Sequence, residues 1–239
     1  MLDVSEKSRP AAEEAPRRRL PPEERARRIL EEATHFFAEH GLGESTRALA
    51  DRLGVAQALI YRYFPSKQAL LDKVINYLFE KLWDDSWGAW LADRSVPLDE
   101  RLVRLYVAYL DRASPVSIRL FVRASLDGSD IVHRYSGLLT EQILKPVLAE
   151  LRVEAGLPGF DARPMIPGER EIAMILHGGV IFLGIRKHVY KVALPDNLTE
   201  LIRLQVTTFL LGALPRLKAL HDAHEQGQAG GRGVISARD

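Results

Sequence analysis

Residues 44–71 read ESTRALADRLGVAQALIYRYFPSKQALL, and this stretch decides the fold of the N-terminal part of the chain. Within it, Gly54 follows Ala50 by four positions and Ile60 follows Gly54 by six. A small residue at Ala50 lets two helices cross closely, Gly54 can take the left-handed conformation that ends the first helix, and Ile60 can fill their shared core. The spacing predicts a helix-turn-helix, although on its own it also fits an ordinary helical hairpin.

Apolar side chains at helical spacing extend outward from this stretch in both directions. Pro22 suits a first helical turn and Gly41 a helix end, so we expect a helix over residues 22–40. Two short helices are expected over residues 46–53 and 56–64, with Ser45 capping the first of them. A long helix is expected to start after Ser66 and to link this head to the rest of the chain.

The rest of the chain keeps the helical period. Helices are expected over residues 98–112, 115–127, 129–155, 169–192 and 198–221, divided by proline and glycine, and no alternating strand pattern is visible. We therefore predict an all-α fold of about nine helices, with a three-helix head over residues 22–67 and a larger body over 68–223. Residues 1–21 and 224–239 lack apolar periodicity and are expected to be a disordered arm and tail.

Composition excludes several classes of protein. Of the 239 residues 46% are hydrophobic and 27% charged, which is typical of a folded globular chain. The absence of cysteine excludes disulfides, thiolate metal sites and cysteine nucleophiles. The net charge is only +1, so any affinity for nucleic acid must be local, and the residues between 41 and 67 carry more basic than acidic side chains. With no apolar leader or long apolar run, we expect a cytoplasmic protein without a membrane span.

The second short helix of the head carries side chains suited to reading base edges. Those expected to face outward are Gln57, Ala58, Tyr61 and Arg62. A glutamine can bond an adenine edge in two places, an arginine can bond a guanine edge, and small Ala58 permits close approach to the groove. The tyrosines and Lys67 suit contacts to phosphate, and so does the helix N-terminus that Ser45 is expected to cap.

The continuation of this stretch resembles the head of the TetR family of bacterial repressors, which reads IA-x-x-x-GV-x-x-x-x-(L/I)Y-x-(H/Y)F-x-(S/N)K-x-x-L. Residues 49–71, LADRLGVAQALIYRYFPSKQALL, stand in that register. The resemblance implies that Arg47 and Gln57 contact bases. It also implies that the DNA backbone is held by Thr46, Tyr61, Tyr63 and Lys67.

Two features near the head bear on this resemblance. Leu59 stands where many family members have threonine or serine, so one hydroxyl contact to phosphate is missing, and Arg62 is a candidate to replace it. The arginines at 17–19 can reach a minor groove from the N-terminal arm, or they can belong to a solvated tail.

The resemblance further implies that the last two long helices pair with those of a second subunit. Such a homodimer would present two heads ~34–36 Å apart to a palindromic operator in double-stranded DNA. We expect a transcriptional repressor that a small apolar or aromatic ligand releases from DNA. The candidate ligand-binding residues are Trp83, Trp87, Tyr106, Tyr109, Phe121, Arg123, Met174, His177 and Phe182. Their aromatic spacing also fits a plain core.

Other functions are weighed against this one. The sequence contains none of the Walker, GxGxxG, GxSxG or HExxH motifs, so we do not expect an enzyme or a cofactor. His221 and His224 lie about one helical turn apart, but no metal site is expected there. A DNA-binding regulator without an effector, whose body only dimerises or binds protein, remains open, as does activation in place of repression.

Overall fold

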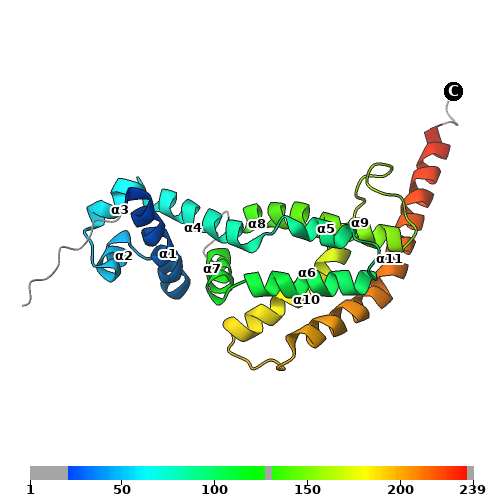
Figure 1. Ribbon diagram of the computed structural model, residues 1–239. Helices are drawn as coiled ribbons and strands as arrows, with labels where there is room; N and C mark the ends of the chain where they lie inside the picture. Colours follow the sequence, from blue (N-terminus) through cyan, green and yellow to red (C-terminus); the bar gives the residue numbers. More distant parts are fainter. Residues whose placement is uncertain (1–20, 127–130, 236–239) are drawn as a thin grey trace, which may run out of the picture.

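The computed structural model describes residues 21–126 and 131–235. Within these ranges every regular element is helical, which confirms the predicted all-α fold (Figure 1). The first helices are α1 (Pro22–His40), α2 (Thr46–Leu53), α3 (Gln57–Tyr63), α4 (Lys67–Leu82), α5 (Ser86–Ala92) and α6 (Leu98–Arg112). They are followed by α7 (Pro115–Leu126), α8 (Ile131–Leu139), the π-helical turn η1 (Thr140–Leu144), α9 (Lys145–Glu154), α10 (Glu169–His188) and α11 (Leu198–Ile235).

Helices α1, α2, α3 and the first half of α4 enclose the hydrophobic core of the head. Phe37, Leu49, Ile60 and Leu70, one from each helix, are fully buried in it. Local chemistry sets the helix ends, because Ser45 Oγ accepts a hydrogen bond from the Ala48 amide at 3.1 Å as the cap of α2. The expected helix-turn-helix geometry of this segment is therefore present.

Helix α7 belongs to both halves of the molecule. Leu120 and Ala124 on one face are fully buried in the core of the head, where α7 packs along α1. Ile118 on another face is buried in the core of the body. Helix α4 joins the two halves in the same way, since it enters the head core at Leu70 and the body core at Leu82 (Figure 1).

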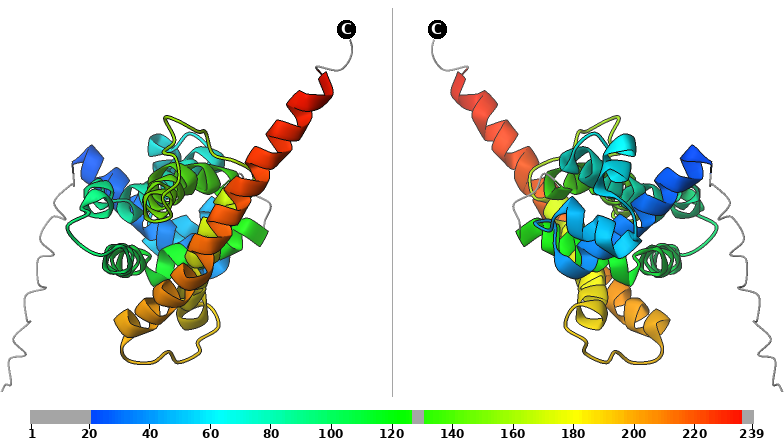
Figure 2. Two further views of the ribbon diagram at one scale, coloured as in Figure 1. Left: turned by 90° about the vertical axis from the view of Figure 1, so that its right-hand side faces the viewer. Right: turned by 90° about the vertical axis from the view of Figure 1, so that its left-hand side faces the viewer.

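The body is built around α6, which packs against α4, α5, α9, α10 and α11. Helix α6 packs against α10. Helix α11 crosses the body and extends beyond it (Figure 2). A buried ion pair ties the C-terminal side together: Arg152 on α9 donates two hydrogen bonds to the Glu169 carboxylate, at 2.8 and 2.5 Å. His221 on α11 completes this contact, with its Nε2 2.9 Å from a Glu169 oxygen.

Two predictions about helix bounds are wrong. The sequence predicts one long helix after Ser66, but α4 ends at Leu82 and α5 starts at Ser86. The break occurs at Asp84, whose Oδ1 accepts hydrogen bonds from both the amide and the hydroxyl of Ser86. The disordered tail expected from residue 224 is helical to Ile235, and Arg163 pairs with Glu225 at 2.5 Å within its first part. The arm over residues 1–20 lies outside the described residues.

Candidate nucleic-acid interface and internal cavity

The outer face of α2 and α3 brings together the side chains predicted to contact DNA. Thr46 is buried in the first turn of α2, and its Oγ1 accepts a hydrogen bond from Gln57 Nε2 at 2.8 Å. The Tyr61 hydroxyl lies 2.9 Å from the same Thr46 oxygen. These three side chains from two helices therefore form one hydrogen-bonded cluster, which holds Gln57 and Tyr61 in place at the surface.

The basic side chains of this face differ in whether they bond to other parts of the chain. Arg47 and Arg62 are exposed, and neither forms an ion pair or hydrogen bond with any residue that the structure describes. Lys67 Nζ donates to the Gly43 carbonyl at 2.9 Å, which ties the start of α4 to the loop before α2. Of the remaining predicted contact residues, Ser45 and Ala58 are exposed and Tyr63 is half-buried.

Arg52, which contributes to the local basic charge of the sequence, is engaged in ion pairs within the head. It bonds two carboxylates of α1, Glu32 at 2.5 Å and Glu39 at 2.6 Å. These hydrogen bonds raise the pKa of Arg52, and the bond from Arg52 lowers the pKa of Glu39. The pairs brace α2 against α1 and leave Arg47, Arg62 and Lys67 as the basic groups of the candidate interface.

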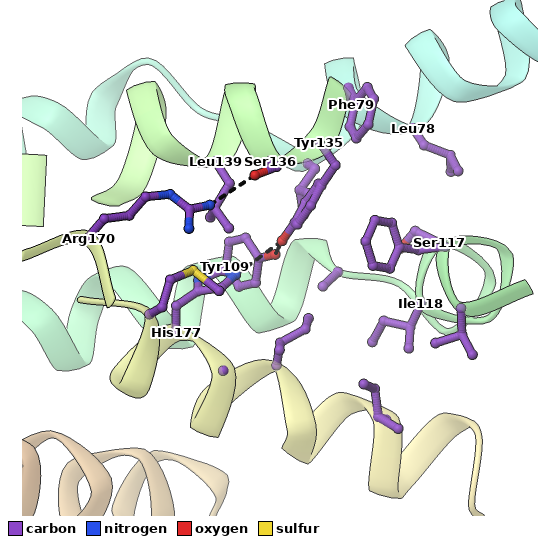
Figure 3. A pocket seen from close by; sticks show the side chains of 18 residues that line it. Leu78, Phe79, Tyr109, Ser117, Ile118, Tyr135, Ser136, Leu139, Arg170 and His177 are labelled. Carbon is purple, nitrogen blue, oxygen red and sulfur yellow. Dashed lines mark hydrogen bonds between the residues drawn. The ribbon is translucent and has the colours of Figure 1, made fainter. Parts of the chain in front are cut away.

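A cavity of about 300 Å³ lies in the body, between α4, α6, α7, α8 and α10 (Figure 3). It is lined by Leu78, Phe79, Leu82, Tyr109, Ala113, Ser117, Ile118, Phe121, Val122, Tyr135, Ser136, Leu139, Arg170, Met174, His177, Gly178, Ile181 and Ile185. Most of these side chains are apolar. The volume lies at the lower end of the ~300–1,000 Å³ that small-molecule sites occupy.

Four of the nine predicted ligand-binding residues line this cavity: Tyr109, Phe121, Met174 and His177. The other five do not. Trp83, Trp87 and Tyr106 pack around Tyr109 and support it from behind, with ring centroids 6.3, 6.1 and 6.5 Å from that of Tyr109. They therefore belong to the core around the cavity wall.

Two of the predicted ligand residues point elsewhere. Arg123 is exposed on α7, with its guanidinium beside Gly41 at the end of α1. Phe182 is 46% exposed on α10 and contacts Tyr190. Both residues are predicted as ligand contacts from their residue type alone, because the sequence does not show which face of α7 or α10 points inward. Neither of them lines the cavity.

A chain of hydrogen bonds runs along one wall of the cavity (Figure 3). The Tyr109 and Tyr135 hydroxyls are 2.6 Å apart, and the Tyr135 hydroxyl is 3.1 Å from His177 Nε2. Burial lowers the pKa of His177 to about 4 and raises the pKa of Tyr135 to about 12. All three groups are therefore uncharged at neutral pH.

Sequence reasoning missed several polar residues of the cavity, above all Arg170, Ser117 and Ser136. Arg170 stands in the first turn of α10, where an exposed charged side chain is ordinary, and no periodicity marks it as facing inward. Its position became visible only through the packing of α10 against α8 and η1. Elsewhere in residues 21–126 and 131–235, no helix is long and apolar enough to cross a bilayer, and no cluster of His, Asp or Glu has the makeup of a metal site.

Comparison with known proteins places these features in a family. The model of bacterial regulatory proteins of the tetR family matches residues 29–74. An HTH-type transcriptional repressor from Mycobacterium tuberculosis is 32% identical over 158 residues, which cover 65% of this chain and 70% of that protein. The regulator LuxR from Vibrio harveyi is 36% identical over 64 residues, which cover 26% of this chain and 31% of LuxR.

Solved structures agree on the fold. A TetR-like transcriptional regulator from Rhodococcus sp. RHA1 superimposes with a TM-score of 0.63 at 19% identity, covering 81% of this chain and 100% of that one. The TetR-family regulator PfmR from Thermus thermophilus gives 0.55 at 21% identity, covering 77% and 98%. With the helix-turn-helix head and the long match to the mycobacterial repressor, the chain belongs to the TetR family of bacterial regulatory proteins and is a DNA-binding transcriptional regulator.

Proposed function

We propose that this protein is a cytoplasmic, homodimeric repressor that binds a palindromic operator and releases it when a small apolar ligand enters the cavity of the body. The observation that carries this proposal is the double role of α4 and α7. Each helix supplies residues to the core of the head and to the wall of the cavity. A ligand that moves either helix therefore also moves the DNA-contacting face.

DNA recognition is assigned to α3 and the start of α2. Exposed Arg47 and Arg62 supply charge and guanine-type contacts, while Gln57 is oriented toward the groove by its bond to Thr46. Phosphate contacts are assigned to Ser45, Tyr63 and Lys67, with Tyr61 and Thr46 bracing one another. Ala58, which is small and exposed, leaves room for the groove edge.

Dimerisation is assigned to the outer faces of α10 and α11, which pack against each other. Large apolar side chains remain exposed there: Ile175 and Phe182 on α10, and Leu204 and Leu211 on α11. Gly212 adds to this, since a Cβ at that position would meet no atom within 4 Å in this chain. A glycine inside a helix costs about 1 kcal/mol relative to alanine, and close approach of a second subunit offsets that cost.

Ligand control is assigned to α7. Ile118 and Phe121 face the cavity, and Leu120 and Ala124 face the head, so the helix is contacted from both sides. Arg123 lies against the end of α1 at Gly41, which adds a third link between α7 and the head. A body that served only for dimerisation would favour a solid core, and the open, apolar cavity favours the sensor.

The test is selection of bound duplexes from a random DNA pool by the purified full chain, with its mass in solution measured in parallel. We expect enrichment of a palindrome with half-sites about one helical turn apart, bound by a dimer. Enrichment of a single half-site by a monomer would contradict the dimeric repressor. No enrichment at moderate salt would contradict sequence-specific recognition.

A further inference from the structure

Among the described residues that line the cavity, Arg170 is the one charged side chain, and the rest are apolar or uncharged. We propose that the ligand is an apolar carboxylic acid whose carboxylate binds Arg170 and whose tail fills the cavity toward α7. This inference rests on the proposed function, because it names the chemical class of the ligand for the same cavity.

Arg170 is positioned to bind an anion. Its Nη2 donates to Ser136 Oγ at 2.9 Å (Figure 3). Its Nε donates to Thr140 Oγ1 at 3.3 Å, so two hydroxyls of α8 and η1 hold the guanidinium at one end of the cavity. A guanidinium has five N–H donors, and these bonds use two of them. Nη1 also forms an ion pair with the exposed Glu171 carboxylate at 3.6 Å, and a pair this long and this exposed competes only weakly with a bound anion.

The second hydroxyl that contacts Arg170 belongs to Thr140, the first residue of the π-helical turn η1. Thr140 Oγ1 bonds the Ser136 carbonyl at 2.8 Å at the point where α8 changes into η1. Ser136, Leu139 and Thr140 are spaced at i, i+3 and i+4 and so share one helix face: Ser136 and Leu139 line the cavity, and Thr140 contacts Arg170. Single π turns inside α-helices are concentrated at functional sites, which agrees with this placement.

The remaining polar groups disfavour a cationic ligand. Tyr109, Tyr135 and His177 bond one another, and His177 is neutral. Ser117 donates to the Ser114 carbonyl at 2.8 Å. No carboxylate lines the cavity among the residues described, so an ammonium group would find no counter-ion, whereas a carboxylate would find a charged, two-pronged donor.

The geometry also orients the ligand. Arg170 stands at one end of the cavity, and Ser117 and Ile118 of α7 stand at the other (Figure 3). Arg170 is partly open to solvent, with 35% of its side chain exposed, so the carboxylate keeps part of its hydration and its burial costs less. The apolar tail would then extend toward Phe121 and Ile118, two α7 side chains that line the cavity at this end.

The experiment is calorimetric titration of the full chain at pH 7.5 with decanoate and with 1-decanol, which share a tail and differ in charge. We expect decanoate to bind at least tenfold more tightly. Arg170→Met should abolish that preference and leave the affinity for decanol within about twofold. Arg186→Met is the matched control, because Arg186 lies on the same helix outside the cavity lining, and it should keep the preference.

Three results would decide the matter. Equal binding of acid and alcohol by the unmodified chain would overturn the inference while leaving a ligand-sensing repressor intact, and that comparison needs no variant. Binding of neither probe would overturn both the inference and the sensing role, while the DNA selection above still tests recognition separately. A third probe, 5-phenylpentanoate, distinguishes an aryl tail from an alkyl tail. Tighter binding than decanoate supports an aryl tail, and weaker binding supports an alkyl tail. Either result supports binding of the carboxylate.

Discussion

At the scale of single residues, we propose that the head makes two kinds of DNA contact, to base edges through Arg47 and Gln57 and to phosphate through Lys67. Gln57 and Tyr61 both bond Thr46, whereas Arg47 and Arg62 are exposed without such bonds in the described part of the chain. A base contact contributes to discrimination between sequences, while a phosphate contact contributes equally to all of them. The two kinds of residue are therefore separable by mutation.

We expect Arg47→Ala or Gln57→Ala to reduce discrimination between the operator and unrelated DNA by about 1–3 kcal/mol. Lys67→Ala should instead weaken binding to all sequences alike and lower the salt slope by about one, because it removes one cation near phosphate. Binding isotherms on specific and random duplexes at several salt concentrations measure both effects. An equal loss of discrimination in all three variants would contradict the assignment of roles.

His177 makes stability depend on pH. Burial lowers its pKa to about 4 in the folded chain, against the ordinary value of 6.5 that applies when the chain is unfolded. The unfolded chain therefore binds the proton first, and the free energy of unfolding falls as the pH drops from about 6.5 to 4, by about 3 kcal/mol. We expect His177→Gln to remove this fall, as measured by urea unfolding at pH 7, 6, 5 and 4.

Other buried groups respond at lower pH and serve as an internal control. For Glu169, burial raises the pKa, but the hydrogen bonds from Arg152 and His221 outweigh it and hold the pKa below 4.5. Ionised Glu169 therefore contributes to the free energy of unfolding above pH 4.5, and this contribution is lost as the pH falls further. The His177→Gln variant should retain this acid loss, and identical pH profiles for the two proteins above pH 4 would contradict the role of His177.

At the scale of elements, one glycine shapes the turn between α2 and α3. Gly54 has φ 64° and ψ 36°, the left-handed conformation, and its amide bonds back to the end of α2. A Cβ there would meet no atom within 4 Å, so only the backbone conformation opposes a side chain. The position of α3 at the surface depends on this turn.

Gly54→Ala should lower the free energy of unfolding by about 1–2 kcal/mol, the cost of the left-handed conformation for a residue with a Cβ. Gly43→Ala is the matched control, because Gly43 also has open space around its Cβ position and its φ is not positive. Chemical unfolding of the two variants provides the comparison. A loss of the same size in both would show that the conformation at Gly54 is not the cause.

At the scale of the whole molecule, the apolar surface of α10 and α11 is the feature that a single chain does not explain. Leu211 is 82% exposed and Ile175 is 69% exposed, on two helices that pack against each other. Exposed large apolar side chains that gather in one place mark interaction surfaces. A second copy of the chain is the partner that we propose for this surface.

Leu211→Arg should convert the dimer into a monomer at concentrations where the unmodified chain is dimeric, because two like charges would face each other near the symmetry axis. The monomer should keep its helical content and lose the preference for two half-sites. Val153→Arg, at a 45% exposed position on α9, is the control and should leave the mass unchanged. Light scattering gives the masses, and a dimeric Leu211→Arg variant would place the interface elsewhere.

Features that depend on neighbouring residues are predictable from the sequence. Helical periodicity predicted the all-α fold, and the spacing of Ala50, Gly54 and Ile60 predicted the helix-turn-helix, because capping, turn conformation and close crossing are local in the chain. The same local rules also failed at specific places. Asp84 ended α4 through its bonds to Ser86, and Arg163 stabilised a helix beyond residue 221 from another part of the fold.

Only the tertiary structure decided which residues face the cavity. Tyr109, Met174 and His177 line it, while Trp83, Trp87 and Tyr106 stand behind its wall and Phe182 faces outward. All of these are apolar or aromatic residues at helical spacing in the sequence, so periodicity alone does not distinguish a cavity from a core. Arg170 became a candidate ligand contact because α10 packs against α8 and η1. A cavity is set by the packing of distant helices, and no short stretch of sequence encodes that packing.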